Sequence, residues 1–169
     1  MADPTPLSDE QLDAFLTDGY LTLQPSQLSV SDHERLYRRA TGLYDTARAL
    51  GSPTAHLDVL GDNLRAQIPE VEGLLADPVI DGALTSILGP DYMVHPHSYC
   101  HRSGDESQAF HQDGNLPWNE RGHARTHRGD WVMLFYYPQD VDESNGPTEV
   151  VAGSQYWTID HETDDGRWH

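Results

Sequence analysis

The sequence predicts an α+β fold, with helices in residues 1–90 and β structure in residues 91–169. In the first half, apolar residues recur at the spacing of amphipathic helices and follow helix-capping residues. In the second half, short aromatic and β-branched runs alternate with clusters of Gly, Pro, Asn and Asp. Short strands with long connections are typical of a jelly-roll or barrel, so we expect N-terminal helices packed on one within a single domain.

The first predicted helix begins at a capping box. Ser8 is expected to cap the helix while the side chain of Gln11 reaches back to it. Gly19 is expected to end the helix, because glycine adopts the left-handed conformation of a helix C-terminus without strain. A short strand is predicted at residues 20–23.

Two further helices are predicted before residue 90. A second capping pattern at residues 31–34 opens a longer helix, whose apolar residues keep the helical period up to Gly51. Gly42 weakens the middle of this helix by about 1 kcal/mol relative to alanine. The Asp-Pro pair at 77–78 starts the third helix, and the Gly-Pro pair at 89–90 closes it.

The β half contains four predicted strands, at residues 92–101, 108–111, 131–137 and 148–151. Pro96 places the first strand at a sheet edge or a bulge, because proline has no backbone N–H to donate. Along the third strand, large apolar side chains alternate with others, and most are expected to face the core: Trp131, Met133, Phe135 and Tyr137.

Composition excludes several classes of function. The chain has 10 basic and 28 acidic residues and a net charge of −18, so nucleic acids and membrane surfaces are poor partners. Every basic residue is an arginine, which excludes a Schiff-base lysine and the lysine of a phosphate-binding loop. The single cysteine, Cys100, is expected to be a small buried residue. No apolar run is long enough to span a bilayer and no signal peptide is visible, so we expect a cytoplasmic protein.

A His-x-Asp pair, His111 and Asp113, is the sharpest candidate for chemistry. On a strand, residues two apart point to the same side, so both could coordinate one metal ion. Two histidines and one carboxylate on one face of Fe(II) leave positions open for a co-substrate and dioxygen. The spacing alone is weak, because a chain this rich in His and Asp contains about one such pair by chance, and a second occurs at His56 and Asp58.

The surroundings of His111 distinguish the two pairs. It ends a predicted strand and precedes a Gly turn, and residues 145–154 then form a tight turn, a short buried strand and a second Gly turn. With the opening segment 7–20, these landmarks resemble the phytanoyl-CoA dioxygenase family of Fe(II)/2-oxoglutarate oxygenases. The segment 145–154 is similar to the family's N-G-P-L-x-V-x-P-G-S-H pattern. It departs from that pattern at Thr148 for Leu, at Ala152 for Pro, and in the following Gln155 for His.

This resemblance implies a double-stranded β-helix, a jelly-roll, that binds Fe(II) and uses 2-oxoglutarate and dioxygen to hydroxylate a small-molecule or acyl substrate. Ascorbate is a further candidate cofactor. The resemblance implies His111 and Asp113 as metal ligands, with Gln112 beside them and Phe135 facing the co-substrate. Trp118, just past the metal motif, either lines the way to the substrate or packs on its loop.

The family also implies a later strand with a distal histidine ligand, followed by an arginine that pairs with the far carboxylate of 2-oxoglutarate. The sequence reaches His169 before either is expected. We therefore expect these 169 residues to be the N-terminal part of a longer enzyme, with an incomplete jelly-roll. We expect this part alone to be inactive and prone to aggregation, because an interrupted jelly-roll exposes unpaired strand edges.

Other histidines leave alternatives open. Those at positions 95, 97 and 101 alternate along a predicted strand and could serve a cupin-like metal enzyme without 2-oxoglutarate, although sheet histidines are more often structural. Those at 123 and 127 are expected in a flexible loop, and those at 161 and 169 in an acidic tail. From a different class, the chain could be a non-catalytic jelly-roll binding protein or an inactive fragment without a complete metal triad.

Overall fold

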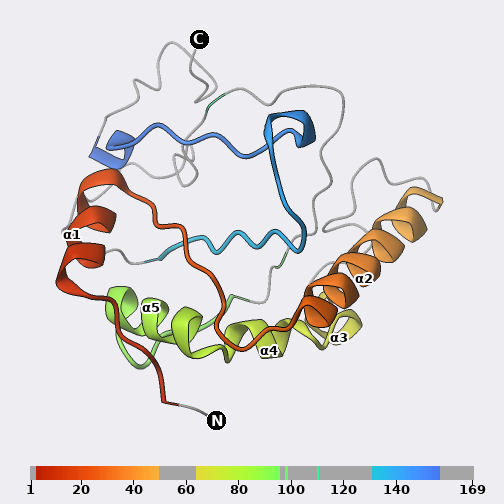
Figure 1. Cartoon of the computed structure of the whole chain (residues 1–169), viewed down its shortest axis with the longest axis horizontal. Coiled ribbons are helices and arrows are strands. Elements are labelled where there is room, and N and C mark those ends of the chain that lie inside the picture. Colours follow the sequence, from red (N-terminus) through yellow and green to blue (C-terminus); the bar gives the residue numbers. More distant parts are fainter. Residues whose placement is uncertain (1–2, 50–63, 96–97, 99–109, 111–130, 157–169) are drawn as a thin grey trace, which may run out of the picture.

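Helices dominate the part of the chain that the computed structural model describes, namely residues 3–49, 64–95, 98, 110 and 131–156. Figure 1 shows α3, α4 and α5 in a row along one side, with α1 at one end of the row and α2 at the other. The elements in chain order are α1 (Asp9–Asp18), α2 (Val30–Ala49), α3 (Leu64–Gln67), α4 (Val71–Leu75), α5 (Pro78–Leu88) and the 3-10 helices η2 (Glu143–Asn145) and η3 (Ser154–Tyr156).

Helix α1 begins and ends as its capping residues predict. The N–H of Gln11 donates to Ser8 Oγ (3.2 Å), and the N–H of Ser8 donates to Gln11 Oε1 (3.0 Å). Gly19 takes a left-handed φ of 84° and donates its N–H to the carbonyl of Phe15 (2.8 Å). The strand predicted at 20–23 is not formed in the structure, where these residues are an irregular connection to α2.

Helix α2 begins one residue before its predicted capping pattern. Ser29, rather than Ser31, is the cap, because it forms a reciprocal pair with Asp32. The Asp32 N–H donates to Ser29 Oγ (3.3 Å), and the Ser29 N–H donates to Asp32 Oδ2 (2.8 Å). The predicted end at Gly51 lies outside the described residues. None of the helices in the described ranges combines the length and apolar character that a membrane crossing requires.

Helices α3 and α4 were not predicted, because helices of four and five residues are too short to show a helical period. They bracket Ile68, which packs with Leu36 of α2 in a small buried cluster, each side chain being 3% exposed. The partly buried residues around this pair come from three parts of the chain: Leu28, Ala40, Leu43, Tyr44, Val71 and Tyr136. The cluster therefore joins α2 to the α3–α4 region and to the second half of the chain.

Helix α5 has the predicted start and end, at the N-cap Asp77 and the C-cap Gly89. Asp77 is 1% exposed, and its carboxylate accepts the N–H groups of Val79 (3.0 Å) and Gln27 (2.7 Å). Ser26 Oγ approaches the same carboxylate at 3.4 Å. Burial raises the pKa of Asp77, but the backbone N–H groups around the carboxylate outweigh burial and hold this pKa below its ordinary value. The cap of α5 is thus also the anchor of the α1–α2 connection.

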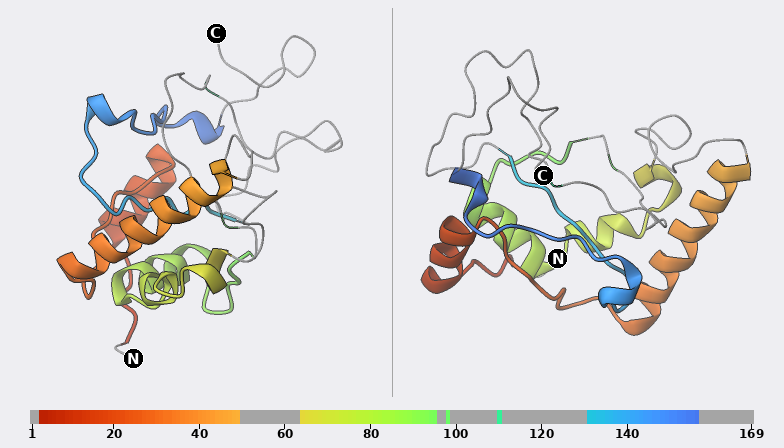
Figure 2. Two further views of the ribbon diagram at one scale, coloured as in Figure 1. Left: turned by 90° about the vertical axis from the view of Figure 1, so that its right-hand side faces the viewer. Right: turned by 90° about the horizontal axis from the view of Figure 1, so that it is seen from above.

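The N-terminal segment crosses α5 at a glycine. The N–H of Thr5 donates to the carbonyl of Pro78 (2.8 Å), and the N–H of Leu7 donates to Ser86 Oγ (3.0 Å). A Cβ atom on Gly82 would lie 1.9 Å from the carbonyl oxygen of Thr5, so no larger residue fits there without displacing this segment. Figure 2 shows from two further directions how the N-terminal segment lies beside α5.

The second half contains two extended segments, residues 131–137 and 146–151, which run in opposite directions on either side of η2 (Figure 1). Within the described ranges, neither is paired in a strand ladder. Half of the strand predicted at 92–101 and all of that at 108–111 except residue 110 lie outside the described residues, so the jelly-roll stays a prediction.

Two glycines at helical positions should respond oppositely to the same substitution. No atom lies within 4 Å of a Cβ on Gly42 of α2, so Gly42→Ala should raise the free energy of unfolding by about 1 kcal/mol through helix propensity. Gly82→Ala should lower it by about 1–3 kcal/mol, because the added methyl overlaps the Thr5 backbone. Urea unfolding followed by circular dichroism checks both, and equal shifts of the same sign would contradict this packing.

Loss of the buried cap of α5 should lower the free energy of unfolding more than loss of the exposed cap of α1. Asp77→Asn should lower the free energy of unfolding by about 2 kcal/mol at neutral pH, because one of the buried N–H groups loses its acceptor. Ser8→Ala, at the exposed cap of α1, should cost about 1 kcal/mol.

The Asp77 effect should also depend on pH. Because the pKa of Asp77 is depressed in the folded protein, the stability it confers is complete above the unfolded value of about 3.9. It is lost as the pH falls through the depressed folded value. The free energy of unfolding of the unsubstituted chain and of Asp77→Asn should be measured from neutral to acid pH. The difference between the two should shrink below about pH 4. A difference that grew on acidification would have the wrong sign.

Candidate functional site

The structure describes only part of the predicted site. Phe135 lies in the described segment 131–137, and His95 is described and exposed. The other predicted site residues and candidate ligands lie outside the described residues: His56, Asp58, His97, Cys100, His101, His111, Gln112, Asp113, Trp118, His123, His127, His161 and His169.

In segment 131–137, the large side chains that were expected to face inward are exposed. Trp131, Met133, Phe135 and Tyr137 are 53%, 48%, 56% and 44% exposed. Tyr136, on the opposite face, is partly buried against the Leu36–Ile68 cluster. The prediction that the alternating large side chains face the core is therefore wrong for the described structure. Tyr136 is the residue of this segment that packs against the cluster, while Leu134, on the same side, is 41% exposed.

Tyr136 makes the contact that fixes this orientation. Its hydroxyl oxygen lies 2.6 Å from Nδ1 of His33 on α2. The two rings are stacked, with centroids 5.8 Å apart and planes 22° apart. Burial, and then the negative charge of Asp32, raise the pKa of Tyr136 to about 12, so the phenol stays neutral at physiological pH. A neutral phenol can either donate to the imidazole or accept from it.

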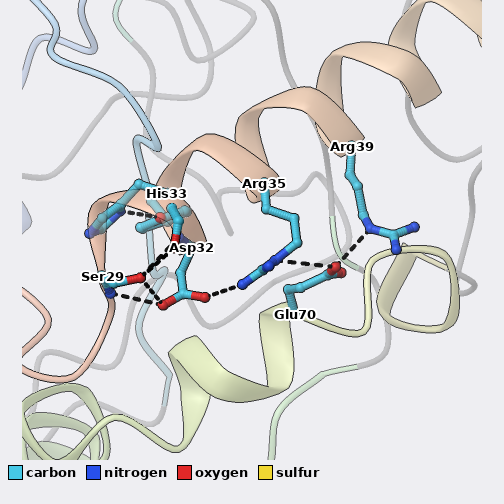
Figure 3. Close-up of polar contacts among 8 residues, drawn as sticks. Ser29, Asp32, His33, Arg35, Arg39 and Glu70 are labelled. Atoms are coloured by element: carbon cyan, nitrogen blue, oxygen red, sulfur yellow. Dashed lines mark hydrogen bonds and ion pairs between the residues drawn. The ribbon is translucent and has the colours of Figure 1, made fainter.

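A separate group of polar contacts lies beside His33 on α2 (Figure 3). Hydrogen bonds from Ser29 to the Asp32 carboxylate hold the pKa of Asp32 below its ordinary range. Arg35 pairs with Asp32, and its Nε lies 3.8 Å from Glu70 Oε1, which also accepts from Arg39 Nε at 2.8 Å. These pairs are largely exposed, so each contributes little to stability, but together they set α2 over the turn between α3 and α4.

The predicted tight turn at residues 145–147 is confirmed and follows the 3-10 helix η2. The Asp142 carboxylate accepts the N–H of Ser144 (2.8 Å), and Asn145 Oδ1 accepts the N–H of Asp142 (2.9 Å). Gly146 then takes a left-handed φ of 66°. The stretch after the turn is not buried as predicted, because Val150 is 56% exposed.

The second Gly turn lies against the C-terminal end of α1. Gly153 has a φ of 77° and donates its N–H to the carbonyl of Asp18 (2.9 Å). The hydroxyl of Tyr137 in the first extended segment donates to Thr148 Oγ1 (2.5 Å) in the second. These contacts join the second Gly turn to α1, and Thr148 of the second extended segment to segment 131–137.

His33 is the residue that sequence reasoning missed. It was noticed only as part of a capping pattern, and its partner Tyr136 is 103 positions away. Local spacing carries no information on such a pair.

Comparison with protein families matches the family described as phytanoyl-CoA dioxygenase over residues 2–169. The match covers nearly the whole chain, including both described turns and the predicted metal motif. The chain therefore belongs to the phytanoyl-CoA dioxygenase family, whose members are generally Fe(II)/2-oxoglutarate-dependent dioxygenases. Comparison with curated proteins gives no match, and comparison with solved structures gives none.

Among the described residues, no group of three or more His, Cys, Asp or Glu side chains is arranged to hold a metal ion. The metal ligands that the family implies, His111 and Asp113, lie outside that part of the chain. Of the predicted site, the described structure contains Phe135 and the segment with the two Gly turns.

The Tyr136 contact should be visible in an alkaline titration. Tyr136→Phe should remove one tyrosine that ionises near pH 12 and lower the free energy of unfolding by about 1 kcal/mol. Because the folded pKa is raised, the stability that this phenol confers is complete below about pH 10 and is lost as the pH rises through the folded value. Tyrosinate absorbance and urea unfolding measure the two effects.

Tyr92→Phe is the matched control for this titration. Burial and the hydrogen bond from Tyr92 to Asp81 raise its pKa to about 12 as well, but it lies outside the α2 contact. Each variant should lose one late-ionising tyrosine, and only Tyr136→Phe should release segment 131–137 from α2. An unchanged titration in Tyr136→Phe would contradict the described contact.

Proposed function

We propose that this chain is part of a non-haem Fe(II)/2-oxoglutarate-dependent dioxygenase that hydroxylates a small-molecule or acyl substrate while 2-oxoglutarate is decarboxylated to succinate. The observation that carries the proposal is the family match over residues 2–169. The order of landmarks in the sequence supports it, since the His-x-Asp motif precedes the turn at 145–147 as in the family. The proposed architecture is a jelly-roll that the helices cover and that these residues build in part.

His111 and Asp113 are the proposed metal ligands. Their donor set suits Fe(II), because an imidazole nitrogen and a carboxylate oxygen are the ligands that non-haem iron oxygenases combine on one face of the metal. Bound iron would supply the dioxygen chemistry, and the protein supplies ligand geometry, a dry pocket and substrate orientation. Gln112, between the two ligands, is proposed to hydrogen-bond beside the metal rather than to bind it.

Phe135 is proposed to border the 2-oxoglutarate pocket. Two observations support this role: its side chain is 56% exposed, and it shares the face of segment 131–137 that points away from α2. An apolar wall suits the methylene carbons of 2-oxoglutarate and keeps water from the reacting centre. Trp118 is proposed to contact the substrate.

The metal motif can be tested against an internal control. An anaerobic titration of the full-length protein with Fe(II) and 2-oxoglutarate should produce a weak visible charge-transfer band, and His111→Ala or Asp113→Ala should abolish it, since each removes a ligand. His56→Ala and Asp58→Ala remove the other His-x-Asp pair and should leave the band unchanged.

Three outcomes would contradict the proposal. A band that survives in both His111→Ala and Asp113→Ala would exclude these ligands. Loss of metal binding in His97→Ala or His101→Ala instead would favour a cupin-like site. No band and no succinate with the full-length protein would favour a non-catalytic binding protein.

A further inference from the structure

Residues 153–156, which contain the second Gly turn, donate hydrogen bonds to the C-terminal end of α1. The last turn of a helix leaves carbonyl oxygens without intrahelical donors, and α1 has no basic residue in its last turn. Here the donors come from residues far along the chain. Gln155 Nε2 donates to the carbonyls of Leu16 and Thr17, both at 3.2 Å.

Two neighbours of Gln155 complete this set of hydrogen bonds. The N–H of Gly153 donates to the carbonyl of Asp18 (2.9 Å), and the hydroxyl of Tyr156 donates to the carbonyl of Leu16. The approach is close, because a Cβ atom on Gly19 would lie 2.4 Å from Gln155 Oε1. Residues 153–156 are therefore held to α1 by several donors at once.

The same segment is tied at its other end to the first extended segment. Thr148 Oγ1 accepts the hydroxyl of Tyr137 at 2.5 Å. Tyr137 is two residues from Phe135, so both side chains lie on one face of segment 131–137. On the other face, Tyr136 is held by His33. The orientation of the Phe135 face is thus fixed from both sides, from α2 and from Thr148.

Thr148 and Gln155 both depart from the family pattern, which has Leu and His at these positions. A leucine could not accept the hydrogen bond from Tyr137. A histidine has one N–H available in its neutral form, whereas the carboxamide has two. The replacements therefore fit the two contacts that the structure shows.

We propose that Thr148 and Gln155 are positioning residues, which together clamp segment 146–156 between α1 and segment 131–137 and so set the orientation of the Phe135 face in the oxygenase site. The inference rests on the proposed function, because Phe135 is taken to border the 2-oxoglutarate pocket. Neither residue is assigned contact with substrate or metal. Each acts through the segment that it holds.

Gln155→Glu tests the clamp on α1. At neutral pH the introduced carboxylate has no N–H to donate and faces carbonyl oxygens at the negative end of the helix, so hydrogen exchange at the Gly19 amide should be roughly tenfold faster. Protonation lets the carboxyl group donate again, so exchange, corrected for its intrinsic pH dependence, should recover below about pH 4.3. Facing carbonyl oxygens, the introduced carboxyl group should have a higher pKa in the folded protein than in the unfolded chain. Protection of the Gly19 amide from exchange should therefore be lost as the pH rises through that folded pKa.

Gln11→Glu is the matched control on the same helix. The side-chain oxygen of Gln11 accepts the N–H of Ser8 at the positive end of α1, and a glutamate keeps that capping box. Exchange at Gly19 should be unchanged in this variant. Equal effects of the two substitutions, or no effect of Gln155→Glu at any pH, would overturn the clamp.

Thr148→Val and Thr148→Ser test the link to the site. Valine keeps the shape but removes the acceptor, so the affinity for 2-oxoglutarate in the presence of Fe(II) should fall roughly three- to tenfold, while Fe(II) affinity alone is unchanged. Serine keeps the hydroxyl and should restore the affinity. The visible band of the Fe(II)–2-oxoglutarate complex measures both.

Failure of the proposed function and failure of the positioning role would give different results. If the unsubstituted full-length protein binds no 2-oxoglutarate, the proposed function and the inference that rests on it both fall. If the unsubstituted full-length protein binds 2-oxoglutarate and Thr148→Val binds it equally well, the positioning role falls while the proposed function stands. Loss of affinity in Thr148→Val with rescue in Thr148→Ser supports both.

Discussion

The helical half of this chain depends on one buried carboxylate. Asp77 is 1% exposed, and moving a charge out of water costs several kcal/mol unless hydrogen bonds replace its hydration. The replacement comes from the backbone N–H groups of Val79 and Gln27 and from the hydroxyl of Ser26. Since these donors belong to two segments fifty positions apart, the buried carboxylate is fully hydrogen-bonded only while α5 and the α1–α2 connection stay together.

The position of α2 follows from this anchor. Gln27 lies just before α2, so fixing it brings Leu36 over Ile68 and Glu70 within reach of Arg39. The exposed ion pairs refine this arrangement but add little stability. Burial of the two apolar side chains contributes more, on the order of 1.5–3 kcal/mol each. The described core is small, so the arrangement of the described helices rests on a few contacts of large effect.

The sequence predicts those parts of the fold that are decided within a few residues. The caps of α1 and α5 involve neighbours at most four positions apart, and they were correct. The start of α2 was missed because two overlapping serine–acid patterns compete there, and only the structure shows that Ser29 pairs with Asp32. For segment 131–137, alternation predicts two faces but cannot say which is inward. That choice is made by His33, which is remote in sequence from Tyr136.

For the candidate site too, the sequence predicts what depends on local order and misses what depends on partners remote in sequence. The His-x-Asp spacing carries little information alone, and the order of landmarks pointed to the family that the comparison then showed. The roles of Thr148 and Gln155 were not predictable, because each depends on a partner from another segment. Within the described ranges, no strand ladder joins these segments, so side-chain hydrogen bonds of about 1 kcal/mol each hold the Phe135 face in place. Bonds of that size are individually weak, and a site held by them requires several acting together, which explains why residues 153–156 present several donors to α1 rather than one.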